Sequence, residues 1–334
     1  MPNKHKVLFA LAFAYFGCYV PYSAITKALT SAHIAGDATV TGLMLLPVMT
    51  AASTLAMVAT ITGLGWWRYA RGADGKGWPR PNRWTLLSGL ATAMILVTTT
   101  LAYTFEGVSL GFVMLVMRGG VLVIAPVVDL MTGRRIRWFS WVALGLSLVS
   151  LANTLLTRVG DVPLLCALDL ACYLLGYVIR LRLMAKLGKS HDPSVRRRYF
   201  VEEQMVAAPA AVVLLVLLAV FGPPGIHVPL RHGFFDLWTH STVGWAIVAG
   251  ICSQGTGVFG GLMLLDASEA TYCVPLNRAM SILGGVVAAS VLALWFGVRA
   301  PSLGELIGAG LLVSAIGVLW LGPLISQRLA VGKT

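Results

Sequence analysis

The chain of 334 residues is 57% hydrophobic and only 11% charged, and its mean hydropathy is +0.82. Its 25 Lys and Arg residues outnumber its 13 Asp and Glu residues, which gives a formal net charge of +12. This composition predicts an integral membrane protein and excludes a separate soluble domain, because the longest polar intervals, about 68–83 and 185–199, are loop-sized. We therefore expect one all-α membrane domain over residues 1–334, with the lipid bilayer as its surroundings.

Apolar segments long enough to cross the bilayer recur along the whole chain. An α-helix rises about 1.5 Å per residue, so about 20 apolar residues span the hydrocarbon core. We predict ten spans, at about 7–28, 38–64, 84–103, 108–129, 138–157, 162–184, 203–221, 242–265, 271–297 and 303–325. The first is expected to stay as a span and not to be cleaved as a signal peptide. An even number of spans places both termini on one side.

Positive charge is distributed unevenly between the loops. The side opposite the N-terminus carries Lys27, Arg158, Arg231 and Arg299, whereas the side of the N-terminus carries most of the other Lys and Arg residues, Arg180 among them. This bias predicts that both termini are cytoplasmic, in a plasma or inner membrane in preference to an organelle membrane. The basic residues are scattered over short loops, which argues against a nucleic-acid partner.

Two stretches of the chain share an order of features. Each begins with a Glu at the start of a span, Glu106 or Glu269, where a helix-capping role is expected. The span that follows contains an Arg, in Met-Arg-Gly at Arg118 and in Asn-Arg-Ala at Arg278. A short loop then leads to a Gly-Leu-rich span in both. These features indicate an internal repeat.

The repeat divides the spans into two groups of five, about 7–157 and about 162–325. Because each group has an odd number of spans, the two groups must have opposite orientations in the membrane. Inverted repeats are typical of secondary transporters, whose solute site lies near the bilayer midplane. The fold that we predict is therefore ten transmembrane helices in two inverted five-helix repeats.

Two arginines fall inside predicted spans. A cation near the centre of a span costs roughly 2.5 to 3.5 kcal/mol on insertion scales, so Arg118 and Arg278 should face protein or a water-filled cavity and an anion. The planar guanidinium matches a carboxylate or a phosphate, which favours an anionic solute. The alternative is internal neutralisation, by Asp169, Glu202 or Glu203. The sequence leaves both open.

The predicted plan of ten spans with cytoplasmic termini resembles the drug/metabolite transporter superfamily over nearly the whole chain, and three stretches carry the resemblance further. Residues 125–145, APVVDLMTGRRIRWFSWVALG, are similar to the end of its fourth span and the charged turn that follows. Residues 275–278, Pro-Leu-Asn-Arg, are similar to the Gly-Ala-Leu-Asn-Lys motif of nucleotide-sugar transporters, and the related triose-phosphate translocators use a Lys-Arg pair there for phosphate. Residues 200–204 are loosely similar to a Phe-Tyr-Asn-Asn motif, with Glu203 and Gln204 in place of the Asn pair.

The resemblance implies a polar solute site. Together with the intramembrane charges, it makes these residues substrate-binding candidates: Arg278, Arg118, Asn277, Gln204, Glu203, Lys27 and Tyr173. Lys27 either contacts a phosphate or extends to the membrane surface. Asn277 and Tyr173 contact either solute or a neighbouring helix. Asp169 is either a charge partner of an arginine or a proton-coupling carboxylate.

The function that we expect is secondary transport of a small anionic organic metabolite, with phosphorylated and nucleotide-sugar-like solutes included. The alternative is an exporter of amino acids or other small metabolites or drugs. We expect no enzyme, because no nucleophile and base cluster is readable. No His-Glu-x-x-His zinc motif occurs, and Gly332 is not preceded by the glycine of a P-loop, so no metal or cofactor is expected. A homodimer is left open.

Overall fold

The computed structural model describes residues 2–30, 40–71, 78–101, 110–155, 164–297 and 303–331, and in these ranges the regular structure is helical, without strands. The first group of long helices is α1 (Pro2–Leu29), α3 (Gly42–Gly63), α5 (Arg83–Leu101), α6 (Leu110–Met131) and α7 (Trp138–Leu155). The second group is α8 (Leu164–Leu183), α9 (Pro193–Phe221), α11 (Val243–Leu264), α12 (Ala270–Phe296) and α13 (Leu303–Val331). Short elements lie between them: α4 (Trp67–Ala70), the π-helix η1 (Met184–Gly188), α10 (Pro224–Phe235) and the 3-10 helix η2 (Leu237–Thr239).

A helix lies over each segment that the sequence predicts as a span. Within the described ranges, 6 helices are long and apolar enough to cross a membrane, namely Lys6–Leu29, Gly42–Gly63, Pro193–Phe221, Val243–Leu264, Ala270–Phe296 and Leu306–Ser326. The prediction of an all-α, multi-pass membrane protein is thereby confirmed. The count of ten spans and their inverted arrangement stay predictions.

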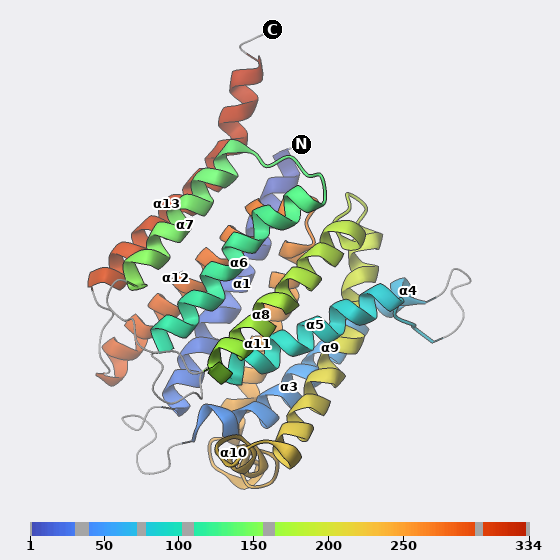
Figure 1. Cartoon of the computed structure of the whole chain (residues 1–334), viewed down its shortest axis with the longest axis vertical. Helices are drawn as coiled ribbons and strands as arrows, with labels where there is room; N and C mark the ends of the chain where they lie inside the picture. Colours follow the sequence, from blue (N-terminus) through green and yellow to red (C-terminus); the bar gives the residue numbers. More distant parts are fainter. Residues whose placement is uncertain are drawn as a thin grey trace.

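The long helices form one bundle. Helix α1 packs against α11 and α12, α7 packs against α13, and α5 packs against α8 and α9. Figure 1 shows α7 and α13 along one flank and α3, α5 and α9 along the other, with α6, α8 and α12 between them. Both termini lie at one end of the bundle and α10 at the other (Figure 1).

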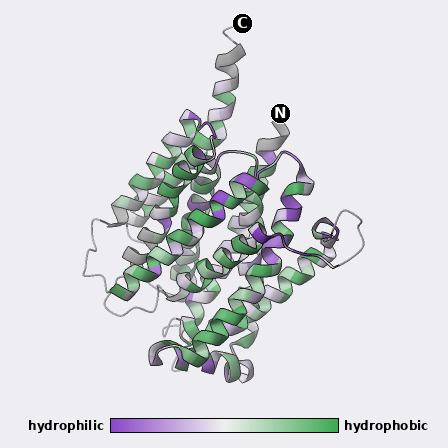
Figure 2. Cartoon of the chain, turned by 45° about the vertical axis from the view of Figure 1, so that its right-hand side comes forward, coloured by the Kyte–Doolittle hydropathy of each residue, from purple (hydrophilic) through white to green (hydrophobic). Residues whose placement is uncertain are grey.

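Large apolar side chains cover the outside of the bundle. Phe221, Leu294 and Trp295 are about four-fifths exposed, at 80%, 82% and 78%. Figure 2 shows apolar residues along the helices, with hydrophilic residues gathered mostly toward the end that carries both termini. Lipid chains are the surroundings in which such surfaces are stable, whereas a soluble protein rarely exposes apolar patches of this extent.

Small residues set how closely some helices approach. A Cβ atom added at Gly89 of α5 would lie 2.8 Å from the carbonyl oxygen of Glu203 on α9. A Cβ atom at Gly250 of α11 would lie 2.5 Å from the carbonyl oxygen of Met49 on α3. Larger side chains at these positions would push the helices apart. The close approach at Gly89 brings its neighbour Ser88 within hydrogen-bonding distance of the Glu203 carboxylate, at 2.6 Å.

Candidate functional site

The two intramembrane arginines each donate to a tyrosine hydroxyl. Nη2 of Arg118 on α6 lies 3.2 Å from the hydroxyl of Tyr19 on α1. Nη2 of Arg278 on α12 lies 2.5 Å from the hydroxyl of Tyr177 on α8, and the Arg278 guanidinium carbon lies 5.0 Å from the centre of the Tyr177 ring. Each cation is therefore held by a neutral hydroxyl. Arg118 and Tyr19 belong to the first predicted repeat, and Arg278 and Tyr177 belong to the second.

Helix geometry places the two arginines at similar depths. The Asp129 carboxylate, near the end of α6, binds the backbone at the start of α12, so the two helices meet there. Arg118 is 11 residues before Asp129, and at 1.5 Å per residue it lies about 16 Å along α6 from this contact. Arg278 lies about 12 Å along α12 from Ala270 by the same rise. Both arginines lie about two turns or more from either end of their helices.

Further tyrosines connect the two positions. The rings of Tyr15 and Tyr19 stack with centroids 5.7 Å apart, and those of Tyr173 and Tyr177 lie 4.9 Å apart. Tyr15 lies within electrostatic range of both Arg118 and Arg278. We name Tyr15, Tyr19, Arg118, Tyr173, Tyr177 and Arg278 the arginine–tyrosine cluster.

Asn277 reaches the edge of this cluster. It is 5% exposed on α12, and a Cβ atom at Gly260 of α11 would lie 3.1 Å from its Nδ2 and 3.0 Å from Cε2 of Tyr15. The absence of a side chain at Gly260 therefore leaves room for Asn277 and Tyr15 together. Of the residues that the sequence singled out, the structure brings Arg118, Tyr173, Asn277 and Arg278 into this region.

The Glu203 carboxylate binds a different arginine. Nε and Nη2 of Arg180 on α8 lie 3.0 and 3.1 Å from its two oxygens, and Ser88 and Thr92 of α5 donate at 2.6 and 3.2 Å. Glu203 is fully buried and Arg180 is 8% exposed. Arg180 is therefore not a loop cation, as the count of charges assumed, but part of a buried ion pair that joins α5, α8 and α9.

Glu202 is also engaged away from the cluster. Its carboxylate accepts from Nε of Arg198 at 2.7 Å and from the Thr85 hydroxyl at 2.8 Å. The two glutamates that the sequence offered as internal partners of Arg118 and Arg278 thus bind Arg198 and Arg180. Gln204, the next residue, is 9% exposed on α9.

Asp169 is buried on α8, two turns before Tyr177. Its side chain is 9% exposed and Oδ2 has no hydrogen-bond partner. Among the described residues, the ion pairs do not include Asp169, Arg118 or Arg278. Lys27 is exposed in the last turn of α1, eight residues beyond Tyr19, which is about 12 Å along the helix. Glu106 lies outside the described residues.

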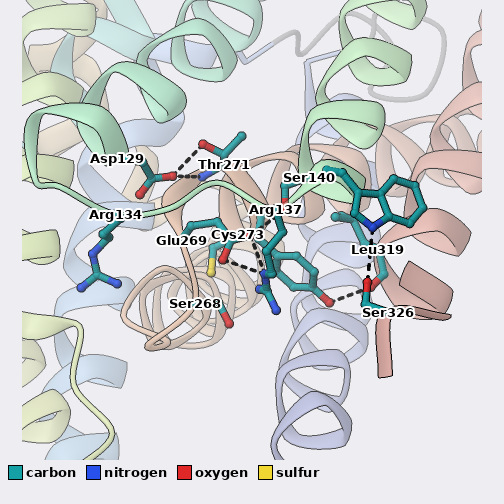
Figure 3. A network of polar contacts seen from close by, with 12 residues as sticks. Asp129, Arg134, Arg137, Ser140, Ser268, Glu269, Thr271, Cys273, Leu319 and Ser326 are labelled. Carbon is teal, nitrogen blue, oxygen red and sulfur yellow. Dashed lines mark hydrogen bonds and ion pairs between the residues drawn. The ribbon is translucent and has the colours of Figure 1, made fainter. Parts of the chain in front are cut away.

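A second polar network joins the predicted repeats where α6 ends and α12 begins (Figure 3). The Asp129 carboxylate accepts from the backbone nitrogens of Ala270 at 2.8 Å and Thr271 at 2.7 Å, and from the Thr271 hydroxyl at 2.6 Å. A carboxylate at this point satisfies nitrogens that have no partner within the helix and interacts favourably with the helix dipole. Asp129 thus caps α12 from a different helix.

The expectation that Glu269 caps α12 is therefore wrong. Glu269 stands at the capping position but makes no side-chain capping bond. Its carboxylate instead accepts from Nε of Arg137, at 2.8 and 3.0 Å, and from the Ser140 hydroxyl at 2.7 Å. Burial alone would raise the pKa of Glu269, but the hydrogen bonds and charge of Arg137, with the Ser140 hydroxyl, outweigh it and hold that pKa below its usual range.

Arg134 completes the network by binding backbone. It donates to the carbonyl oxygens of Ala267 and Ala185, both at 3.0 Å. Ala185 lies in η1, and Lys189, which follows η1, donates to the carbonyl oxygen of Ser268. The α6–α7 connection therefore binds both the α8–α9 and the α11–α12 connections. Sequence reasoning missed Asp129 and Arg134 as network residues, although a charged Asp at the end of a span was a readable signal.

Replacing Asp129 with asparagine should destabilise the protein by about 1 to 3 kcal/mol, because the amide loses one acceptor and places N–H groups against buried donors. The matched control is Asp192→Asn, which changes an exposed N-cap of α9 and should cost about 1 kcal/mol or less. Thermal unfolding of the purified variants measures both. Equal melting temperatures for the two variants would show that the Asp129 cap adds nothing beyond an ordinary surface cap.

Comparison with known proteins shows only the fold. Neither a family model nor a curated protein sequence matches this chain. The structure is similar to solved structures, among them one described as "Crystal structure of protein", with a TM-score of 0.60 and 15% sequence identity, covering 97% of this chain and 99% of that chain. At that identity the likeness is one of architecture over the full length of both chains.

Proposed function

We propose that this protein is a secondary transporter of a small anionic organic metabolite, which works by alternating access of two inverted five-helix halves. The observation that carries the proposal is the pairing of Arg118 and Arg278 with tyrosine hydroxyls instead of carboxylates. Two permanent positive charges inside a membrane bundle favour an anion beside them. A solute that enters and leaves supplies this anion only while it is bound.

The distribution of the other charges supports this proposal. Arg137, Arg180 and Arg198 each bind a glutamate, and Arg196 binds Asp266 at 3.4 Å. The chain thus provides carboxylates for arginines that hold helices together. Breaking a buried pair is costly, so a fixed counter-ion at the solute site would compete with the solute. Arg118 and Arg278 are free of such competition within the described part of the chain.

The arrangement of the cluster also fits two inverted halves. In the predicted repeats, α1 corresponds to α8 and α6 corresponds to α12. Each repeat then supplies one tyrosine helix and one arginine helix, giving the pairs Tyr19–Arg118 and Tyr177–Arg278. A site shared by two such halves can face either side of the membrane as the halves rock, which is the usual plan of inverted-repeat transporters.

A second candidate is an exporter of amino acids or similar zwitterionic metabolites. Asp169 favours it, because this carboxylate lies on the same helix as Tyr177 and has an unpartnered buried oxygen. An ammonium group on the solute would supply the missing partner, while the carboxylate of the solute would bind the arginines. The two candidates share the arginines and differ in whether Asp169 contacts solute.

Thermal stabilisation of the purified full-length protein tests both candidates. Phosphorylated, nucleotide-linked and carboxylate metabolites should raise the unfolding temperature, since a ligand at 100 times its Kd stabilises by about 2.7 kcal/mol. Stabilisation by zwitterions alone, lost in Asp169→Asn, would select the second candidate. Stabilisation by cationic amines and by none of the anions would contradict both.

A further inference from the structure

We infer that the Tyr177 hydroxyl is a placeholder for an oxyanion, and that the edge of Arg278 formed by Nε and Nη2 is where the oxyanion binds. This inference deepens the proposed function, on which it rests for the source of the anion. It names the group of the solute that is recognised, a carboxylate or phosphoryl group, and the protein group that the solute replaces.

The hydrogen bonds of Arg278 define this edge. Nε and Nη2 donate in the same direction along one side of the planar guanidinium, so together they match two oxygens of one anion. Nη2 donates to the Tyr177 hydroxyl at 2.5 Å, whereas Nε is buried without a hydrogen-bond partner. One half of a two-point anion site is thus occupied by a neutral oxygen, and the other half is unfilled by any described group.

An unpartnered buried donor of a charged group is costly, because the group has lost water and gained nothing in exchange. An oxyanion bound along the edge would satisfy Nε and replace the hydroxyl on Nη2. Hydrogen bonds between charged partners are roughly twice as strong as neutral ones, so this exchange is favourable. A halide or a neutral hydroxyl offers a single atom and cannot engage both donors in the same way.

The Tyr177 ring can stay in place during the exchange. The centre of the Tyr177 ring lies 5.0 Å from the guanidinium carbon of Arg278, and the centre of the Tyr173 ring lies 4.9 Å from that of Tyr177. The aromatic contact therefore keeps the guanidinium oriented while the hydroxyl gives up its hydrogen bond. Nη2 of Arg118 likewise donates to a tyrosine hydroxyl, that of Tyr19, at 3.2 Å.

The test measures the affinity of the purified full-length protein for inorganic phosphate and acetate, with chloride at equal ionic strength as the reference. Both oxyanions should stabilise the protein more than chloride does. Arg278→Lys keeps the charge but lacks the edge, so its affinity for the oxyanions should fall at least tenfold. Arg182→Lys, at an exposed position of α8, should leave the affinity unchanged.

Tyr177→Phe decides the role of the hydroxyl. It keeps the ring but removes the group that the anion must displace, so the oxyanions should bind about twofold to tenfold more tightly. A tenfold loss of affinity would mean that the hydroxyl is itself a ligand of the anion, and would overturn the inference. Unchanged oxyanion affinity in Arg278→Lys, or no preference of the wild-type protein for oxyanions over chloride, would overturn it as well. If Arg278→Lys does not fold, Tyr177→Phe alone gives the answer.

Flux through vesicles separates this inference from the proposed function. Oxyanion binding that depends on Arg278, without movement of any anionic metabolite across the membrane, would support the binding edge and contradict transport. Anion transport at the wild-type affinity in Arg278→Lys would support transport and overturn the binding edge.

Discussion

Replacement of Arg278 with alanine is expected to lower the uptake of the anionic solute at least 100-fold while the protein still folds. A hydrogen bond to a charged group contributes about 1.5 to 3 kcal/mol, and the loss of two of them at the solute corresponds to a 100-fold effect or more. Folding should suffer little, because the variant leaves no buried carboxylate behind. Among the described residues, the Arg278 side chain hydrogen-bonds to the neutral hydroxyl of Tyr177.

Uptake into vesicles and thermal unfolding, measured on the same preparations, distinguish a solute role from a structural role. Arg182→Ala removes an exposed arginine from α8 and serves as the matched control for both measurements. Normal uptake by Arg278→Ala would end the claim that this residue binds solute. Severe loss of stability would make Arg278 a structural residue instead.

The largest loss of stability is expected at the buried ion pair of Glu203. Replacing Glu203 with glutamine leaves Arg180 buried without a counter-charge, which should destabilise the protein by about 3 to 5 kcal/mol. The double variant Glu203→Leu with Arg180→Met removes both charges and should recover much of that stability. Asp266→Asn is the matched control, because the side chains of Asp266 and Arg196 are 20% and 27% exposed and their pair should contribute about 1 kcal/mol or less.

Denaturant or thermal unfolding of these variants measures the difference. If the single and double variants unfold at the same temperature, the uncompensated charge is not the cause of the loss. If Glu203→Gln is as stable as wild type, the pair does not hold α5, α8 and α9 together. We thus expect the Arg278 variant to lose uptake and keep its stability, and the Glu203 variant to lose stability.

The sequence located the helices well where the bilayer dictates their length. The segment predicted at about 271–297 is the helix Ala270–Phe296, which ends at Gly297 in the left-handed conformation that glycine adopts readily. The segment predicted from about 203 begins instead at Pro193. Asp192 caps this helix and Pro193 fits its first turn. The first turns of α9 are polar and precede the apolar segment, so a prediction from hydropathy alone does not include them.

The partners of the polar residues could be predicted only in part. The sequence identified Arg118 and Arg278 because a charge within an apolar span is conspicuous. It offered Glu203 both as a substrate-binding candidate and as an internal partner of Arg118 or Arg278, and the carboxylate binds Arg180, 23 residues earlier in the chain. The packing of three helices decides that pairing. Gly89 allows α5 to approach α9, and α8 packs against α5 so that Arg180 reaches the Glu203 carboxylate. The contact of Tyr177 with Arg278 depends on the same packing.

Exchange across the membrane tests the central claim most directly. Vesicles containing the purified wild-type protein are loaded with an anionic metabolite that stabilises it, and entry of the labelled metabolite from outside is followed without ATP. We predict uptake that saturates, exceeds that of protein-free vesicles and is accelerated by the internal metabolite. The acceleration is expected because the single site of an alternating carrier reorients to the outside faster with metabolite bound than when empty. Entry no faster than in protein-free vesicles, for every metabolite that stabilises the protein, would contradict the proposed function.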